Sequence, residues 1–189
     1  MSVAEKFSIV VLVLSWGAQI FRRSLFSRCI KPIFVFSVFG SFCSAVYSAF
    51  LQYYAWKGNK FSVLFLPPYR DWSYFLSYVG FRIFSPILVS LFFALVFKFV
   101  CEFLNRRYEE RFFEPEEGWL FAFGIFMAGY PGFLFYIPLM LVVGLFASLF
   151  YNFLGKGRAP LFYAWLPVAI FAILLKSSIP QSALNFLII

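Results

Sequence analysis

The sequence predicts an all-α, polytopic transmembrane helical bundle, and three observations lead to that prediction. Of the 189 residues, 63% are hydrophobic and 13% are charged, whereas a soluble domain has about 45–50% and about 25%. Several apolar runs come close to the ~20 residues that a helix needs to cross a hydrocarbon core of roughly 30 Å. Lys and Arg gather at the ends of these runs, as in membrane proteins generally. We therefore expect one integral membrane domain over residues 1–189, in contact with the lipid bilayer.

The apolar runs give about six membrane segments. They lie at residues 7–21, 33–56, 83–104, 118–130, 133–154 and 160–175. The run from 118 to 154 has no charged side chain and is broken only at Tyr130-Pro131-Gly132. Its first half is short for a full crossing, so it is a thin span, a re-entrant half-helix or half of a hairpin that turns at the Pro-Gly pair.

The first two segments are separated by a basic stretch. Lys6 precedes the first segment, and Arg22, Arg23, Arg28 and Lys31 follow it. A cleavable signal peptide has the opposite charge order, so we expect a helix that stays in the mature protein. Pro32 suits the first turn of the second segment, and the second segment carries small residues that let another helix approach closely. These small residues are Gly40, Ser41, Ser44, Ala45 and Ser48.

Residues 61–81 have a mixed apolar and interfacial pattern, which predicts a lateral or partly inserted segment. Asp71 is the expected N-cap of a helix that begins at Trp72. Pro86 should kink the following helix or mark a new start. Arg82 and Lys98 lie near opposite ends of the third span, where both can reach the membrane interface as anchors.

Residues 105–117, NRRYEERFFEPEE, form the one strongly hydrophilic stretch. Glutamates before an apolar helix complement its N-terminal dipole, so a solvated loop with helix-start charges is the simplest interpretation. A docking site for a basic partner, or a cation site, is the alternative. With Arg82, the candidate partner or charge sites in and near this loop are Arg106, Arg107, Arg111, Glu114, Glu116 and Glu117.

Several chemistries lack the residues that they need. Histidine is absent, which removes imidazole metal ligands and His-based acid/base catalysis. Cys29, Cys43 and Cys101 stand far apart without a CxxC spacing, and Asp71 is the only aspartate. There is also no glycine-rich phosphate loop. We expect no metal site and no cofactor, and we expect no nucleic acid because the net charge of +8 is placed at membrane boundaries.

The distribution of Lys and Arg predicts a topology. With six crossings, the stretches 22–31, 105–117 and 155–159 share one side and carry nine basic residues. The other side holds both termini and five: Lys6, Lys57, Lys60, Arg70 and Lys176. The positive-inside rule places the first side in the cytoplasm, matrix or stroma. The expected location is thus a bacterial or organellar inner membrane, with both termini on the opposite face.

Residues 86–175 resemble the C-terminal membrane half of prepilin peptidases, which are aspartyl membrane proteases. The shared parts are a long span, a polar loop, a segment with Gly124 and Gly129, a span with Gly144, and a basic turn before Ala159-Pro160-Leu161-Phe162 and a last span. The family's GxGD motif opens the segment after the loop, where this chain has Glu116-Glu117-Gly118-Trp119. Both catalytic aspartates are absent, so the resemblance implies a non-catalytic relative.

Three function classes follow from these observations. The first is a non-enzymatic subunit or scaffold that packs against other membrane protein subunits, because 31 phenylalanines offer contact area without reactive groups. The second is a small membrane enzyme acting on lipid or peptide, with the three glutamates as acid/base groups. The third is a transporter or channel component, suggested by the Pro131-Gly132 break and Arg82. The first hypothesis is favoured over an enzyme.

Overall fold

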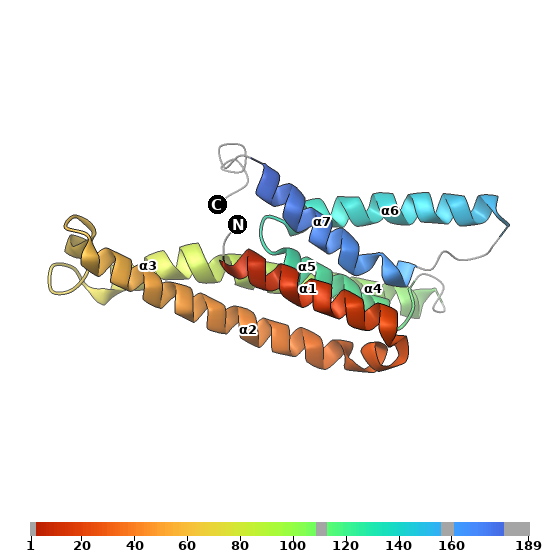
Figure 1. Ribbon diagram of the computed structural model, residues 1–189, viewed down its shortest axis with the longest axis horizontal. Helices are drawn as coiled ribbons and strands as arrows, with labels where there is room; N and C mark the ends of the chain where they lie inside the picture. Colours follow the sequence, from red (N-terminus) through yellow and green to blue (C-terminus); the bar gives the residue numbers. More distant parts are fainter. Residues whose placement is uncertain (1–2, 109–112, 156–160, 180–189) are drawn as a thin grey trace.

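The computed structural model describes residues 3–108, 113–155 and 161–179, and in these ranges all regular structure is helical (Figure 1). The chain order is α1 (Val3–Phe21), α2 (Arg23–Gly58), the 3-10 turn η1 (Ser62–Phe65), α3 (Trp72–Val79), the π-helical turn η2 (Gly80–Phe84), α4 (Ser85–Arg107), α5 (Glu117–Ala128), α6 (Phe133–Phe153), the 3-10 turn η3 (Leu161–Tyr163) and α7 (Trp165–Ser178). The predicted all-α class is confirmed.

Five of these helices are long and apolar enough to cross a membrane. They are Ala4–Phe21, Arg23–Gly58, Trp72–Arg107, Phe133–Phe153 and Leu161–Ser178. The first three contain the predicted runs 7–21, 33–56 and 83–104, and the last two overlap the predicted runs 133–154 and 160–175. The sixth predicted segment, 118–130, corresponds to α5, which has 12 residues. At about 1.5 Å per residue, α5 is roughly 18 Å long, and the Pro-Gly break lies between its end and the start of α6.

The basic stretch after α1 is helical, which differs from the loop expected at 22–31. Only Arg22 interrupts the helices (φ −143°, ψ 62°), so Pro32 lies inside α2 and not in its first turn. Phe26, Ile30 and Phe34 are all buried. Their spacing of four residues forms an apolar stripe that faces the core, and this stripe extends the helix to Arg23 despite the charges.

Proline 86 starts α4 after the π-helical turn η2, in agreement with the expected kink or new start. A proline cannot donate the backbone hydrogen bond that an α-helix directs to the carbonyl four residues earlier, here that of Arg82. The wider π turn accommodates this defect. Ser90 then donates its hydroxyl to the Pro86 carbonyl at 2.7 Å.

Residues 49–79 form a feature that we call the aromatic hairpin: the end of α2, η1 and α3. It projects beyond the N-terminal end of α1, away from the other helices (Figure 1). Its small core of Leu66, Phe75 and Val79 is packed under Tyr53 and Trp56. Asp71 occupies the expected N-cap of α3, but its side chain makes no capping hydrogen bond.

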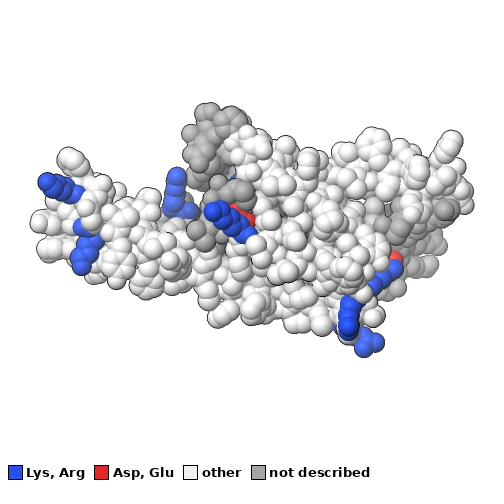
Figure 2. All heavy atoms as spheres, viewed as in Figure 1, with Lys and Arg blue, Asp and Glu red and all other residues white. Residues whose placement is uncertain are grey.

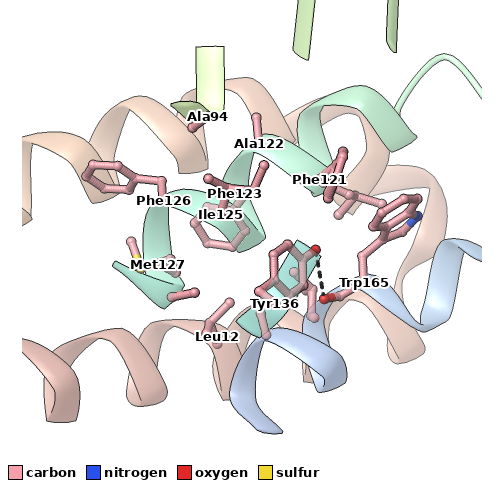
Figure 3. Packing of buried hydrophobic residues seen from close by; sticks show 14 of the residues in the cluster. Leu12, Ala94, Phe121, Ala122, Phe123, Ile125, Phe126, Met127, Tyr136 and Trp165 are labelled. Atoms are coloured by element: carbon pink, nitrogen blue, oxygen red, sulfur yellow. Dashed lines mark hydrogen bonds between the residues drawn. The ribbon is translucent and has the colours of Figure 1, made fainter. Parts of the chain in front are cut away.

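Helix α5 is the centre of the main bundle. All of its residues except Trp119 are buried, and it packs against α1, α2, α4, α6 and α7. Figure 3 shows its side chains filling the space between these helices. A Cβ at Gly124 would overlap the buried Tyr136 ring of α6, and Tyr136 donates its hydroxyl to the Trp165 carbonyl at 3.3 Å. Helix α5 is therefore apolar on every side because it has no exposed face.

Candidate functional site

The start of α5 brings together the three glutamates singled out in the sequence, and each is engaged by a neighbouring group. Glu114 Oε2 accepts a hydrogen bond from Arg23 Nη2 of α2 at 2.9 Å in an ion pair. Ser27 Oγ, one turn further along α2, donates to Glu116 Oε1 at 2.5 Å. Glu117 Oε2 accepts from the backbone N–H of Glu114 at 2.9 Å. The first two contacts fasten the beginning of α5 to α2, and the third is local to the start of α5.

Glu117 is the most enclosed of the three, with 3% of its surface exposed. Helix α4 lies close beside it, because a Cβ at the next residue, Gly118, would be 3.6 Å from Cys101 Cβ. Glu117 thus sits in the first turn of α5, where the helix dipole favours a negative charge. The helix-start role expected from the sequence agrees with this geometry.

A second clasp holds the preceding loop to α4. Asn105 Nδ2 donates to the Phe113 carbonyl at 2.8 Å, and the Phe113 N–H donates to Asn105 Oδ1 at 2.9 Å. One side-chain amide therefore satisfies both backbone groups of Phe113. With the contacts to α2, this arrangement fixes the entry of α5 from two directions.

Two of the arginines predicted for this stretch, Arg106 and Arg107, form no described ion pair with the glutamates. Arg106 and Arg107 are exposed in the last turn of α4, and within the described ranges no ion pair involves either. Arg111 lies outside the described residues. The cation that pairs with Glu114 is Arg23, which we did not select. One signal for this ion pair was available in the sequence, because the predicted topology places residues 22–31 and 105–117 on the same side of the membrane.

Lys98 is an anchored cation near this end of the bundle. Its Nζ lies 2.9 Å from Glu102 Oε1, one helical turn away, and 4.8 Å from the centroid of the Trp119 ring. Only 13% of the Lys98 side chain is exposed. Its charge is therefore compensated locally, in keeping with the anchor role expected from its place in the sequence.

A second group of charges lies at the other end of the bundle, around Arg82. Lys176 Nζ of α7 pairs with Glu5 Oε1 of α1 at 2.9 Å. Arg82, in η2, is exposed and forms no ion pair within the described ranges. All three residues line a cavity of about 310 Å³ between α1, α2, η2, α4, α5 and α7. Arg82 therefore borders a cavity, which the sequence did not predict.

The grouping of acidic and sulfur side chains decides whether the structure offers a metal site. Among the residues that the structure describes, no group of three or more His, Cys, Asp or Glu side chains is placed to hold a metal ion. No protein-family model matches this chain, and no curated protein or solved structure is significantly similar to it. The resemblance to prepilin peptidases stays a prediction.

Proposed function

We propose that this chain is a non-enzymatic integral membrane subunit that contacts another membrane protein through its aromatic hairpin. The observation that carries the proposal is the exposure of large apolar and aromatic side chains on a hairpin that projects beyond the N-terminal end of α1. Large apolar surfaces outside lipid mark protein contact sites. Tyr and Trp side chains are also the ones most enriched in binding hot spots.

We place the hydrocarbon core from the positions of the charges. On the face shown in Figure 2, charged atoms gather in three places along the molecule: at the hairpin tip, near the middle and at the basic end. Along α1, Lys6 and Arg22 are sixteen residues apart, or about 24 Å. A core of roughly 30 Å fits between the middle group and the basic end when the side chains extend outward.

Helix α2 is longer than such a core. It has 36 residues, or about 54 Å. A 30 Å core that begins near Arg28 ends near Ser48, which lines the same cavity as Glu5, Arg82 and Lys176. The last turns of α2 and all of α3 then lie in the headgroup region and beyond it.

The hairpin presents apolar and aromatic side chains at that level. Phe61 is 81% exposed, and the sequence around it supplies further exposed groups. These are Phe50, Leu51, Tyr54, Leu64, Tyr69, Trp72 and Leu76. Tyrosine and tryptophan are common at the headgroup level, but a large exposed patch that also contains phenylalanine and leucine is typical of a protein contact site. We therefore propose a protein partner as its cover.

The proposed orientation follows from the same charges. The basic end, with Arg22, Arg23, Arg106 and Arg107, faces the cytoplasm, matrix or stroma according to the positive-inside rule. The hairpin and both termini then face the other side, in a bacterial inner membrane or an organellar inner membrane. In this placement α5 lies inside the bundle within the hydrocarbon core, and the Pro-Gly turn connects it to α6.

The mass of the native particle tests the proposal. The chain is extracted in a mild detergent at native abundance, and the mass of the particle that contains it is measured. A particle several times larger than 22.0 kDa with other defined chains supports a subunit. A monomer or homodimer in its detergent micelle contradicts the proposal.

A pair of matched variants locates the contact. Phe61→Ser on the hairpin should release the other chains, because it removes an exposed phenyl group from the proposed contact. Phe153→Ser at the end of α6 removes a side chain that is 90% exposed and should leave the particle intact. Equal behaviour of the two variants would count against the hairpin as the contact surface.

The burial of Glu117 favours one second candidate, a small membrane enzyme acting on lipid or peptide. A carboxyl group with 3% exposure at a helix start is a plausible acid/base group if substrate reaches it. Glu117→Gln keeps the shape and removes the charge. Loss of a turnover activity with an unchanged particle mass would favour the enzyme. No change in either the activity or the particle mass would support the subunit.

A further inference from the structure

The cavity around Arg82 has an amphipathic lining. Its walls include apolar side chains of α1, α4 and α5, such as Phe7, Ile87 and Phe126, together with hydroxyl groups of five serines. Three of the serines, Ser41, Ser44 and Ser48, follow one another on a single face of α2 at helical spacing. The serine stripe thus lines a cavity, while the close helix contact expected from the small residues occurs at Gly40, where the Phe7 ring of α1 packs.

Among the described residues that line the cavity, the side-chain charges sum to one positive charge, from Arg82, Lys176 and Glu5. Glu5 and Lys176 form an ion pair, and only 19% and 16% of their side chains are exposed. Their charges cancel. Arg82 lines the same space from η2 and forms no hydrogen bond or ion pair within the described ranges. A guanidinium with its donors unused is suited to a bidentate contact with phosphate or carboxylate.

The position of the cavity narrows the choice of ligand. It lies beside the Ser48 level of α2, where the proposed hydrocarbon core ends, so its apolar wall continues toward the acyl chains while Arg82 is at the headgroup depth. Its volume of about 310 Å³ is at the lower end of small-molecule sites. That space suits a headgroup and the first part of an acyl chain better than a whole lipid.

We propose that this cavity binds the phosphate of an anionic phospholipid, with Arg82 as the cation and the serine hydroxyls of α2 as further donors. The apolar wall accepts the beginning of an acyl chain. The proposal depends on the cavity, its charges and the membrane placement given under the proposed function, and it holds whether the chain is a subunit or an enzyme. A soluble phosphate compound could make the same contact with Arg82 as a lipid phosphate. The test therefore compares phospholipids with inorganic phosphate.

Native mass spectrometry of the full chain, purified in neutral detergent and stripped of lipid, measures the binding. Three probes are compared: phosphatidylglycerol, phosphatidylcholine with the same acyl chains, and inorganic phosphate as a competitor. Phosphatidylcholine carries the same phosphate but adds a quaternary ammonium, which the positive charge of Arg82 disfavours. We therefore expect phosphatidylglycerol to bind at least about tenfold more tightly than phosphatidylcholine. Equal binding of the two lipids overturns the proposal. Saturation by inorganic phosphate alone assigns the site to a soluble phosphate and overturns the lipid.

Two variants and one control locate the site. Arg82→Gln should weaken phosphatidylglycerol binding by about tenfold or more. Ser44→Leu should weaken it as well, because the added side chain occupies the cavity and changes no charge. Arg70→Gln, at an exposed arginine of the aromatic hairpin, should have no effect. Full affinity in either cavity variant, with an unchanged elution profile and thermal midpoint, contradicts the assignment.

Discussion

The bundle around α5 and the aromatic hairpin use the same residue types in opposite ways. In the bundle, Phe123, Phe133 and Tyr136 are fully enclosed, and eleven of the twelve residues of α5 are buried. In the hairpin, three residues form the buried core, and most of the aromatic rings keep an exposed face. Aromatic side chains therefore have two separate uses in this chain: they fill a buried interior in the bundle and form an exposed surface in the hairpin.

The two regions also differ in how they are held in place. The bundle is joined by contacts between residues far apart in the sequence, such as Gln19 Nε2 with the Phe162 carbonyl at 2.6 Å. The hairpin is joined by ring contacts between α2 and the segment that follows it, such as Trp56 with Tyr78 at 4.8 Å between centroids. We expect the hairpin to open locally while the bundle stays folded.

The largest expected effect is that of Gly124→Ala in the bundle. The added Cβ would overlap Tyr136, which is fully buried and cannot move away. We expect a loss of about 3 kcal/mol, at the upper end of overpacking costs. The thermal midpoint of the purified protein in detergent measures it.

Two companion variants check this prediction. Gly17→Ala in α1 adds a Cβ that meets nothing within 4 Å, so stability should be unchanged or slightly higher. Gly124→Ala combined with Tyr136→Phe should recover part of the loss, because the hydroxyl is one of the overlapping atoms. A fully stable Gly124→Ala variant would show that α5 and α6 are not packed as described.

The next largest effect is expected for Trp56→Ala in the hairpin. Trp56 makes ring contacts with Phe65, Tyr74, Phe75 and Tyr78. Losing them should cost about 2 kcal/mol locally. Hydrogen exchange should rise in α3 and not in α5. If α5 became equally exchangeable, the two regions would form one cooperative unit, and the comparison would fail.

The smallest effect is expected at the ion pair that fastens α5 to α2. The Arg23 and Glu114 side chains are 52% and 35% exposed, and exposed pairs contribute about 0–1 kcal/mol. Arg23→Ala should cost more than Glu114→Ala, because Arg23 also lies over the Phe162 ring, 4.6 Å from its centroid. A double-mutant cycle on the thermal midpoint separates the two contributions, and a coupling above about 2 kcal/mol would contradict a solvent-screened pair.

Much of the fold could be predicted from the chain because the apolar runs are long and their ends are charged. The regions at 7–21, 133–154 and 160–175 match helices to within a few residues. The helical stretch before Pro32 was missed, since its charges hid the buried stripe of Phe26 and Ile30. Composition alone does not distinguish a helix with one buried apolar face from a loop when basic residues occupy the exposed face of the helix.

The contacts around the glutamates were only partly predictable. Helix-start charges at Glu114, Glu116 and Glu117 follow from their place before an apolar run. Their partners Arg23 and Ser27 lie about 90 residues away, at separations of 91 and 89, and depend on how α2 packs beside α5. The Arg82 cavity depends on the packing of six elements, α1, α2, η2, α4, α5 and α7, which no local sequence pattern shows.

The most direct test of the central claim compares the two regions in their native membrane. A photo-crosslinking amino acid is placed at position 61 in the hairpin and, separately, at position 153 on α6, both of them strongly exposed. We expect a discrete protein adduct from position 61 and none from position 153. Protein adducts from position 153 alone, or none from either position, would contradict the hairpin as the surface by which this chain joins a partner.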